Sequence, residues 1–463
     1  MNQMRILSPT AILGYGFPIE SFQEGMGRKP DVIGVDAGST DPGPYYLGTG
    51  QSFVNAEAVL RDLSLLVPAA KAAGIPLVIG TAGGSGAAPH VAWCLSLLER
   101  VVSDHDLRLD VAVIHGDVPV AAAKAALAAG RMQPLSFVPE LTEETLDRCT
   151  HLVAQMGMEP LIAALSAGPD VVLAGRCYDP AVFAAPMLLR GFQAGPALHL
   201  GKILECAAIA TSPGSGRDCV LGTINSCGFS VTTLSAERRF TVQSVAAHTM
   251  YEKSHPFLLP GPGGQLDLSR VRFTQLDERT VEVRGSEFRP GPPTVKLEGA
   301  VCVGYRTFCI CGIRDGGMIS QLDDIFATLR QAVADNFGKK TLQTDVELRF
   351  RVYGHNGVMG PLEPETRPAG HEVGLVIDVV APTQKQAAAV CGFVRTAALH
   401  LGFPGRISTA GNLAFPFSPS DVDAGPVFEF GVYHIMEVED PVSLFPATYL
   451  VMGAQHHSTG RRQ

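Results

Sequence analysis

The feature that most constrains the fold is a regular alternation, from about residue 30 to residue 190, of short apolar runs and longer stretches with helical spacing. Each apolar run has the length of a β-strand, and all but the run near residue 135 end at or are followed closely by glycine or aspartate. This alternation is typical of βαβ units, so it predicts a doubly wound, mostly parallel sheet with helices on its faces. The expected strands are 31–36, 76–80, 110–115, about 135–138 and 170–176.

The stretches between these runs predict the helices. Thr142 is a plausible N-cap because Glu143 and Glu144 fall in the first turn, where acidic side chains favour a helix, and this helix is expected to continue to Ser166. The full set of expected helices is 56–73, 89–102, 121–129, 142–166 and 180–189.

After about residue 270 the pattern changes to period-two alternation, which indicates half-buried strands. Thr383 and Gln386 form a capping-box pattern for a further helix. The expected order is strand 300–312, helix 319–337, strands 345–353 and 372–380, the capped helix, and strand 427–438. This is a βαββαβ, ferredoxin-like order. We therefore expect an α/β domain with the active site in residues 1–270 and an α+β domain in residues 271–463.

Composition excludes several classes of function. With 463 residues, the chain is longer than one hydrophobic core usually supports. Its composition, 46% hydrophobic and only 17% charged residues, argues against disorder. The net charge of −9 and the scattered basic residues argue against nucleic-acid binding. No apolar run reaches the length of a membrane span and no signal peptide is apparent, so we expect a cytoplasmic protein without a membrane segment. Its ten dispersed cysteines are expected to be free thiols.

The chemistry is expected at the carboxyl ends of the parallel strands, because ligands bind there in open α/β sheets. Aspartates at these ends can act as general bases or carry a divalent cation such as Mg²⁺; singly, each is more simply a turn or cap residue. Arg176 can clamp a substrate carboxylate or pair with Asp179. The glycine-rich loop can bind an anion or form a tight turn. The candidates are Asp36, Ser39, Thr40, Asp41, Gly83, Gly84, Ser85, Gly86, Asp117, Arg176 and Asp179.

A further group of polar residues lies later in the chain. Glu205 lies in the segment Gly201-Lys-Ile-Leu-Glu-Cys206, and His248, Tyr251, Glu252 and His255 are spaced to share one helix face. Such a face suits acid/base catalysis, although a solvated helix face has the same pattern. The segment Tyr353-Gly-His-Asn-Gly357 is most simply a turn, and Cys177 is more simply a packing residue than a nucleophile.

Four motifs resemble the acyclic terpene utilisation (AtuA-like) family, and the resemblance spans most of the first 265 residues. They are Asp36-Ala-Gly-Ser-Thr-Asp-Pro-Gly-Pro44, Gly175-Arg-Cys-Tyr-Asp-Pro-Ala181, Leu204-Glu-Cys-Ala207 and Met250-Tyr-Glu-Lys-Ser-His-Pro256. The resemblance implies a role in the breakdown of acyclic or branched carboxylic acids alongside CoA-ester enzymes. It also favours the motif residues as site residues, and it is compatible with a small companion subunit.

The first hypothesis is a lyase of the hydratase or dehydratase type, or an isomerase, acting on a small carboxylic acid or its CoA ester. Asp117 or Asp179 would be the base, Tyr251 or His248 the acid, and Arg176 with Gly83–Gly86 the anion site. The alternatives are a non-catalytic subunit that binds an acyl-CoA or organic acid, and a CoA-ester hydrolase. A homo-oligomer is the default expectation for such a protein.

Overall fold

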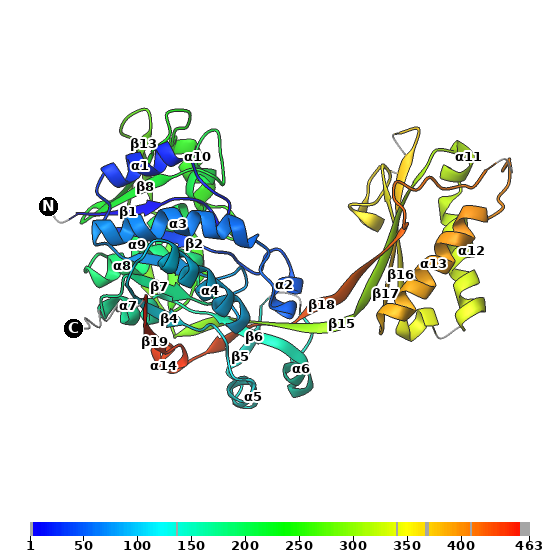
Figure 1. The fold of residues 1–463 in the computed structure, drawn as a ribbon, viewed down its shortest axis with the longest axis horizontal. Coiled ribbons are helices and arrows are strands. Elements are labelled where there is room, and N and C mark those ends of the chain that lie inside the picture. Colours follow the sequence, from blue (N-terminus) through cyan, green and yellow to red (C-terminus); the bar gives the residue numbers. More distant parts are fainter. Residues whose placement is uncertain (1–2, 136–137, 339–340, 366–369, 408–409, 454–463) are drawn as a thin grey trace, which may run out of the picture. The chain divides into compact units, whose positions relative to one another are not determined.

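The computed structural model describes residues 3–135, 138–338, 341–365, 370–407 and 410–453, which form a mixed α/β protein. Its chain folds into two compact units (Figure 1). Unit 1 contains the chain up to Val301 and from Phe430 onward, whereas unit 2 is Cys302–Glu429. This division differs from the expected boundary near residue 270, because residues 271–301 and the C-terminal strand pair with strands of unit 1.

Unit 1 is built on a ten-stranded sheet whose centre is parallel. The parallel strands are, in order, β1 (Gln3–Ser8), β2 (Val32–Asp36), β3 (Leu77–Gly80), β7 (Val171–Ala174) and β4 (Leu109–Ile114). Antiparallel strands extend both edges: β8 (Val220–Asn225), β9 (Gly228–Thr233), β13 (Thr280–Arg284) and β12 (Arg272–Gln275) beyond β1, and β19 (Ala447–Met452) beyond β4. The sheet is therefore mixed, and the expected parallel arrangement is limited to its central strands.

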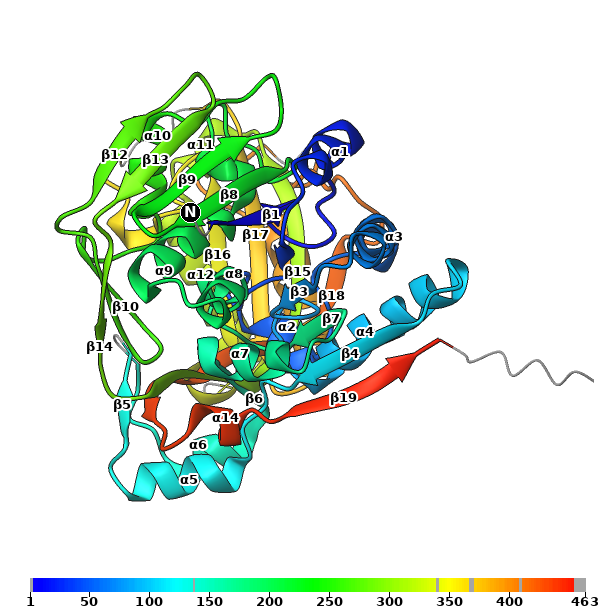
Figure 2. The same ribbon diagram turned by 90° about the vertical axis from the view of Figure 1, so that its left-hand side faces the viewer.

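Helices cover both faces of these central strands, because the strands are apolar on both sides. Ile33 and Val35 pack in one core with α3 and α4, whereas Val32 packs in another core with α8 and α9. Figure 2 shows the two helix layers on opposite sides of the sheet. The helices of unit 1 are α1 (Ile19–Gly27), α2 (Pro44–Thr49), α3 (Ala56–Ala73), α4 (Ala88–Asp104), α5 (Val120–Ala128), α6 (Glu143–Arg148), α7 (Met158–Ser166), α8 (Asp179–Leu189), α9 (Ala194–Leu204), α10 (Val242–Thr249) and α14 (Pro441–Leu444).

The expected single helix over 142–166 is wrong. Thr142 does cap a helix, accepting a hydrogen bond from the Thr145 backbone, but this helix, α6, ends at Arg148. The chain then forms strand β6 (Cys149–Gln155) before α7 begins. β6 pairs with residues 296–301, so a partner distant in the sequence overrides the local helical tendency.

The strand expected near 135–138 lies slightly earlier, as β5 (Met132–Pro134), and residues 136–137 fall outside the described residues. It pairs with β18 (Asp421–Glu437) at residues 434–436 and not with the central parallel strands. A separate three-stranded sheet in unit 1 comprises β10 (Leu258–Gly261), β11 (Gly264–Asp267) and β14 (Glu287–Pro290). These strands follow α10 and supply one side of the cavity described below.

Unit 2 has the expected succession of elements. Its strands are ordered β16 (Glu347–Tyr353), β17 (Val373–Ala381), β15 (Thr294–Ile313) and β18, with the unit boundary inside β15 and inside β18. The helices α11 (Gly316–Ile319), α12 (Leu322–Phe337) and α13 (Gln384–His400) connect them, and Thr383 caps α13 as expected. Buried residues such as Leu329, Ile377 and Val390 form a core of its own.

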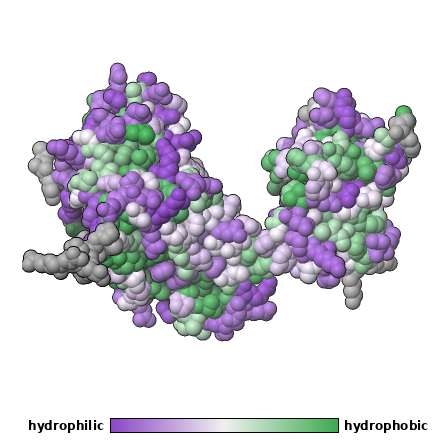
Figure 3. All heavy atoms as spheres, in the orientation of Figure 1, coloured by the Kyte–Doolittle hydropathy of each residue, from purple (hydrophilic) through white to green (hydrophobic). Residues whose placement is uncertain are grey.

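On the face shown in Figure 3, hydrophilic and hydrophobic side chains are interspersed over the surface of each unit. Among the described residues, no helix combines the length and the apolar character needed to cross a membrane.

The packing of the glycine-rich loop predicts unequal effects of two similar substitutions. Gly86 and Gly74 both have a left-handed backbone, with φ of 70° and 63°. A Cβ at Gly86 would lie 2.1 Å from the backbone nitrogen of Arg176, whereas one at Gly74 would meet nothing within 4 Å. We expect Gly74→Ala to cost about 1–2 kcal/mol for its backbone conformation and Gly86→Ala about 1–3 kcal/mol more. Urea unfolding measures both, and equal costs would contradict this packing.

Candidate active site

The carboxyl ends of four central strands converge in unit 1. Asp36 ends β2 opposite Gly80 of β3, and the backbone nitrogen of Ala37 donates to the Gly80 carbonyl at 2.7 Å. The nitrogen of Thr81 donates to the Gly175 carbonyl at 3.0 Å, and that of Gly175 donates to the Ile114 carbonyl at 2.7 Å. Main-chain hydrogen bonds therefore connect the loops that follow β2, β3, β7 and β4.

The glycine-rich loop after β3 packs backbone against backbone. The Gly86 carbonyl accepts a hydrogen bond from the Arg176 nitrogen, and the nitrogens of Gly84 and Gly86 donate to carbonyls of their own loop. A Cβ on Gly38 would clash with the Gly84 backbone at 2.5 Å. A Cβ on Gly83 would clash with His90 at 2.7 Å. The backbone nitrogens of Gly84 and Gly86 thus already donate hydrogen bonds within the protein. The loop's observed role is close packing that seats the Arg176 segment.

Arg176 is buried, and protein groups surround its guanidinium. Its Nε donates to Glu298 at 2.7 Å, and one Nη donates to Asp179 at 3.3 Å and to the Cys177 carbonyl at 3.0 Å. Glu298 is fully buried and also binds Lys296 and the Thr40 hydroxyl, each at 2.7 Å. Arg176 therefore holds the site together, and the ion pair with Asp179 that the sequence left open is present.

Glu298 is a site residue that sequence reasoning missed. It lies in β15 beside Lys296, and the charged residues alternate there with apolar ones as in any half-exposed strand. Burial raises the pKa of Glu298, but the charges of Arg176 and Lys296 outweigh burial and hold the pKa at about 2. Glu298 is thus a permanent anion at the centre of the network.

A second group of polar residues lies at the end of α9. The Lys202 ammonium contacts Glu205 at 2.5 Å, and both side chains are buried. The other carboxylate oxygen of Glu205 is also buried and has no hydrogen-bond partner among the described residues. The Lys202 nitrogen lies 5.4 Å from the centre of the Tyr251 ring, which stacks on His248 at 5.3 Å. The structure therefore brings Glu205, His248 and Tyr251 together, as the sequence proposed.

The expected helix through His255 ends early. α10 stops at Thr249, and Glu252 adopts a left-handed backbone with φ of 60° in the following turn. The His255 ring nitrogen accepts hydrogen bonds from the backbone of Phe257 and Leu258, and both His255 and Glu252 are exposed. Only His248 lies on the helix. The turn after Thr249, and not helical spacing, positions Tyr251 against it.

Electrostatic interactions link the two groups. Burial raises the pKa of Asp36 well above its ordinary value, and repulsion from Asp179 and Glu205 raises it further. Burial also raises the pKa of Asp179 despite the nearby cations Arg176 and Lys202. For Glu205, burial and the Asp179 charge outweigh Lys202 and bring the pKa to about 7. Three neighbouring carboxyl groups thus have raised pKa values, and that of Glu205 lies near neutral pH; raised pKa values of grouped carboxyls are typical of acid/base sites.

Other predicted residues lie at the periphery or play local roles. The Ser39 hydroxyl donates to Asp41 at 2.9 Å, and Asp41 is exposed. Asp117 accepts a hydrogen bond at 3.1 Å from the Ala88 backbone, at the start of α4, as a capping residue does. Ser85 is buried, and its hydroxyl has no partner among the described residues. Burial lowers the pKa of His248 to about 4, so its imidazole is neutral at pH 7.

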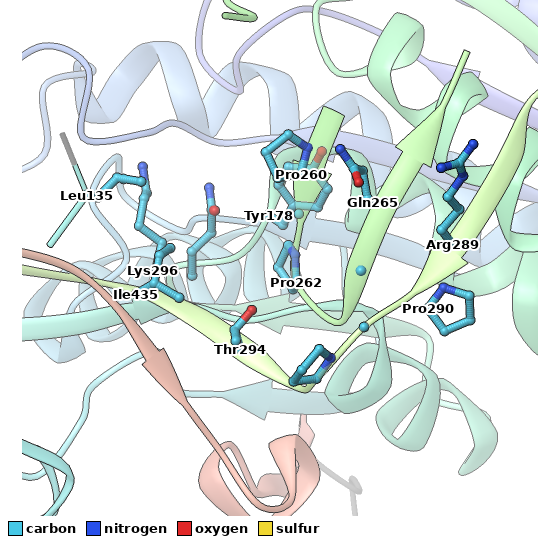
Figure 4. Close-up of a pocket in the computed structure, with 15 residues that line it drawn as sticks. Leu135, Tyr178, Pro260, Pro262, Gln265, Arg289, Pro290, Thr294, Lys296 and Ile435 are labelled. Atoms are coloured by element: carbon cyan, nitrogen blue, oxygen red, sulfur yellow. The ribbon is translucent and has the colours of Figure 1, made fainter. Parts of the chain in front are cut away.

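A cavity of about 530 Å³ adjoins this cluster in unit 1 (Figure 4). Tyr178, between Cys177 and Asp179 in the sequence, forms part of its wall, as does Lys296, the partner of Glu298. Four prolines and several glycines make much of the rest apolar. The lining residues are Leu135, Gln155, Tyr178, Pro260, Gly261, Pro262, Gly264, Gln265, Arg289, Pro290, Gly291, Pro292, Thr294, Lys296 and Ile435.

Within the described residues, no three or more His, Cys, Asp or Glu side chains are grouped so that they could hold a metal ion. Asp36, Asp179 and Glu205 are linked through Arg176 and Lys202 instead. Among the described residues, the strand-end aspartates therefore form no such group, and Mg²⁺ at these strand ends stays a prediction.

Comparison with known proteins identifies a family whose sequence model matches this chain. The sequence model of the acyclic terpene utilisation family protein AtuA matches residues 51–414. The chain belongs to this family. The AtuA match includes the motifs at 175–181, 204–207 and 250–256, begins after the Asp36 motif and, beyond the resemblance seen in the first 265 residues, continues through most of unit 2. Comparisons with curated proteins and with solved structures found no match.

The Arg176–Glu298 pair predicts a pH-dependent loss of stability. Glu298→Gln leaves the buried Arg176 charge without its closest anion, which should cost about 3–5 kcal/mol at pH 7. Because the pKa of Glu298 is depressed to about 2, its stabilisation is present above the unfolded value near 4.3 and is lost as pH falls towards 2. The difference between variant and wild type should therefore shrink below about pH 4.

Denaturant unfolding at several pH values measures this difference. Glu347→Gln is the matched control, since Glu347 makes a half-exposed ion pair with Arg349 and should cost at most about 1 kcal/mol. A Glu298→Gln variant as stable as Glu347→Gln at pH 7 would show that the buried pair is not needed.

Proposed function

We propose that the protein is an acid/base enzyme of the hydratase or dehydratase type that acts on an acyclic or branched unsaturated carboxylic acid or its CoA ester. The observation that carries this proposal is the cluster of Asp36, Asp179 and Glu205, whose pKa values are all raised, next to an apolar cavity with a lysine in its wall. The family membership supports the substrate class, because the family is named for acyclic terpene utilisation.

Hydration of a conjugated double bond requires one group that removes a proton from water and one that supplies a proton to carbon. Glu205 suits the base, since its pKa of about 7 leaves it partly ionised at neutral pH and one of its oxygens has no partner among the described residues. Asp179 suits the acid, because its pKa is raised and its side chain is 24% exposed. The water oxygen bonds to the β-carbon while the α-carbon gains a proton, so the products contain one added water.

The cavity suits the rest of such a substrate. Its volume of about 530 Å³ lies within the range of small-molecule sites, and its proline-rich wall offers apolar contact to a hydrocarbon chain. Lys296 can bind a carboxylate or the oxygen of a thioester, and its charge would stabilise the enolate-like state that forms when the β-carbon is attacked. These roles replace the earlier assignment of Arg176 as anion clamp, since Arg176 is enclosed by Glu298, Asp179 and the Cys177 carbonyl.

Substitution of the two carboxyl groups tests the roles. Glu205→Gln and Asp179→Asn should each lower the hydration rate about 10²- to 10⁴-fold, the range that a general acid or base contributes. Turnover is measured by loss of the ultraviolet absorbance of conjugated acyl thioesters and of the free acids. Glu24→Gln, which changes an exposed carboxylate paired with Arg28, should leave the rate unchanged. Full turnover in both site variants would exclude these residues as the catalytic pair.

The proposal also predicts a pH profile. A base with a pKa of about 7 works only when ionised, so the hydration rate should rise with pH through about 7 and fall about tenfold per unit below it. In Glu205→Gln the remaining activity should lose this transition. A profile that is flat across neutral pH would argue against Glu205 as the base.

Two other functions remain as alternatives to be separated by the same assays. A CoA-ester hydrolase would use the carboxylates to activate water at the thioester, and it would release a free thiol that a thiol reagent detects. A non-catalytic subunit would bind the acyl-CoA or organic acid, seen as a raised melting temperature, but would turn over none of the compounds.

We also infer the fold types of the two units. The order of β15, α12, β16, β17, α13 and β18, with the sheet order β16-β17-β15-β18, supports a ferredoxin-like arrangement in unit 2. The helices on both faces of the parallel strands support a doubly wound arrangement at the centre of unit 1.

A further inference from the structure

Unit 2 contains a second cavity, of about 580 Å³, that the proposed reaction does not use. It lies between α12, the end of β16 and the loop that follows β16, and this loop includes the segment Tyr353-Gly-His-Asn-Gly357. The lining residues are Leu322, Asp323, Phe326, Arg330, Arg349, Phe350, Arg351, Val352, His355, Asn356, Gly357, Val358, Met359, Gly360 and Pro361. Its size is that of a site for a small organic ligand.

The wall of this cavity carries more positive than negative charge. Arg330, Arg349 and Arg351 all line it, and Asp323 is the one acidic residue in the wall. Arg349 pairs with Glu347, and Arg351 lies 3.7 Å from Asp378. These partners neutralise only part of the charge.

Arg330 differs from the other two arginines of the wall in having no ion pair among the described residues. One of its Nη groups donates to the Leu348 carbonyl at 2.6 Å, and its guanidinium lies 5.1 Å from the centre of the Phe350 ring. Among the described residues, no carboxylate forms an ion pair with it. Phe350 in turn stacks on Phe326 at 4.2 Å, with the two rings almost parallel. The arginine is therefore held in place by a carbonyl and a ring while its charge stays available.

The loop beyond β16 adds a polar atom and an apolar edge. The Nδ1 atom of His355 is buried and has no hydrogen-bond partner among the described residues. The Gly357 nitrogen donates to the Val352 carbonyl at 2.8 Å, which closes a tight turn. Val358 and Met359 follow with 85% and 50% of their surface exposed. Apolar side chains this exposed are suited to covering a bound ligand.

We propose that this cavity binds an organic phosphate of nucleotide size. Three arginines favour a ligand with more than one negative charge, and guanidinium groups match the oxygens of a phosphate. Inorganic phosphate alone would leave most of the 580 Å³ unfilled, and a nucleoside fills it with a body that can contact Val358, Met359 and the phenylalanine pair. The inference does not depend on the function proposed for unit 1.

Isothermal titration calorimetry of the full chain with adenosine monophosphate tests this site. Binding is expected at one site per chain and should weaken as salt is raised, because the arginines are partly exposed. Arg330→Gln should raise the dissociation constant about tenfold or more, because the ligand loses a hydrogen bond to a charged group. Arg314→Gln is the matched control, since Arg314 is also an exposed arginine of unit 2 that donates to a backbone carbonyl, but it lies outside the cavity wall.

Two further ligands decide whether both parts of the nucleotide matter. Adenosine and inorganic phosphate should each bind more weakly than adenosine monophosphate, and hexanoate, a singly charged carboxylate with an apolar chain, should not compete with it. Coenzyme A also carries a phosphorylated adenosine, so displacement of adenosine monophosphate by coenzyme A would also support the proposal. No binding by the wild type, equal losses in Arg330→Gln and Arg314→Gln, or tighter binding of hexanoate would each overturn it.

Discussion

The buried ion pair between Arg176 and Glu298 is the interaction on which the site depends. A guanidinium removed from water is costly unless anions and hydrogen-bond acceptors surround it, and here Glu298, Asp179 and the Cys177 carbonyl do so. Glu298 in turn fixes Thr40 and Lys296, so one fully buried carboxylate ties together the loop after β2, the loop after β7 and the strand β15. Glycines allow these backbones to come close enough for the pair to form.

This arrangement separates structural charges from titratable ones. Arg176 and Lys296 keep Glu298 ionised, whereas burial raises the pKa values of Asp36, Asp179 and Glu205 despite the nearby cations. The cluster thus contains permanent ions that hold geometry and carboxyl groups with raised pKa values, of which Glu205 titrates at about 7. Such a division between fixed and variable charge is what proton-transfer catalysis requires.

The sequence predicted the candidate site better than the path of the chain around it. Asp36, Arg176, Asp179 and Glu205 were found because parallel strand ends converge and because family motifs mark them. Glu298 was missed, since a glutamate in an alternating strand looks solvent-exposed until its neighbours are known. The helix expected to run to Ser166 was interrupted by β6 for a similar reason: the strand exists because residues 296–301 pair with it. His255 was misplaced because a turn after Thr249 ends the helix.

By itself, the sequence determined the mixed α/β character, four of the five central parallel strands, the long helices α3, α4, α12 and α13, and the family. These follow from local periodicity and from motifs, which are properties of neighbouring residues. Only the tertiary structure decided that residues 271–301 and the last strand belong to unit 1, that the parallel strands sit inside a mixed sheet, and that Glu298 and Lys202 complete the site. Those features depend on pairings and on burial between segments far apart in the chain, and no local pattern carries that information.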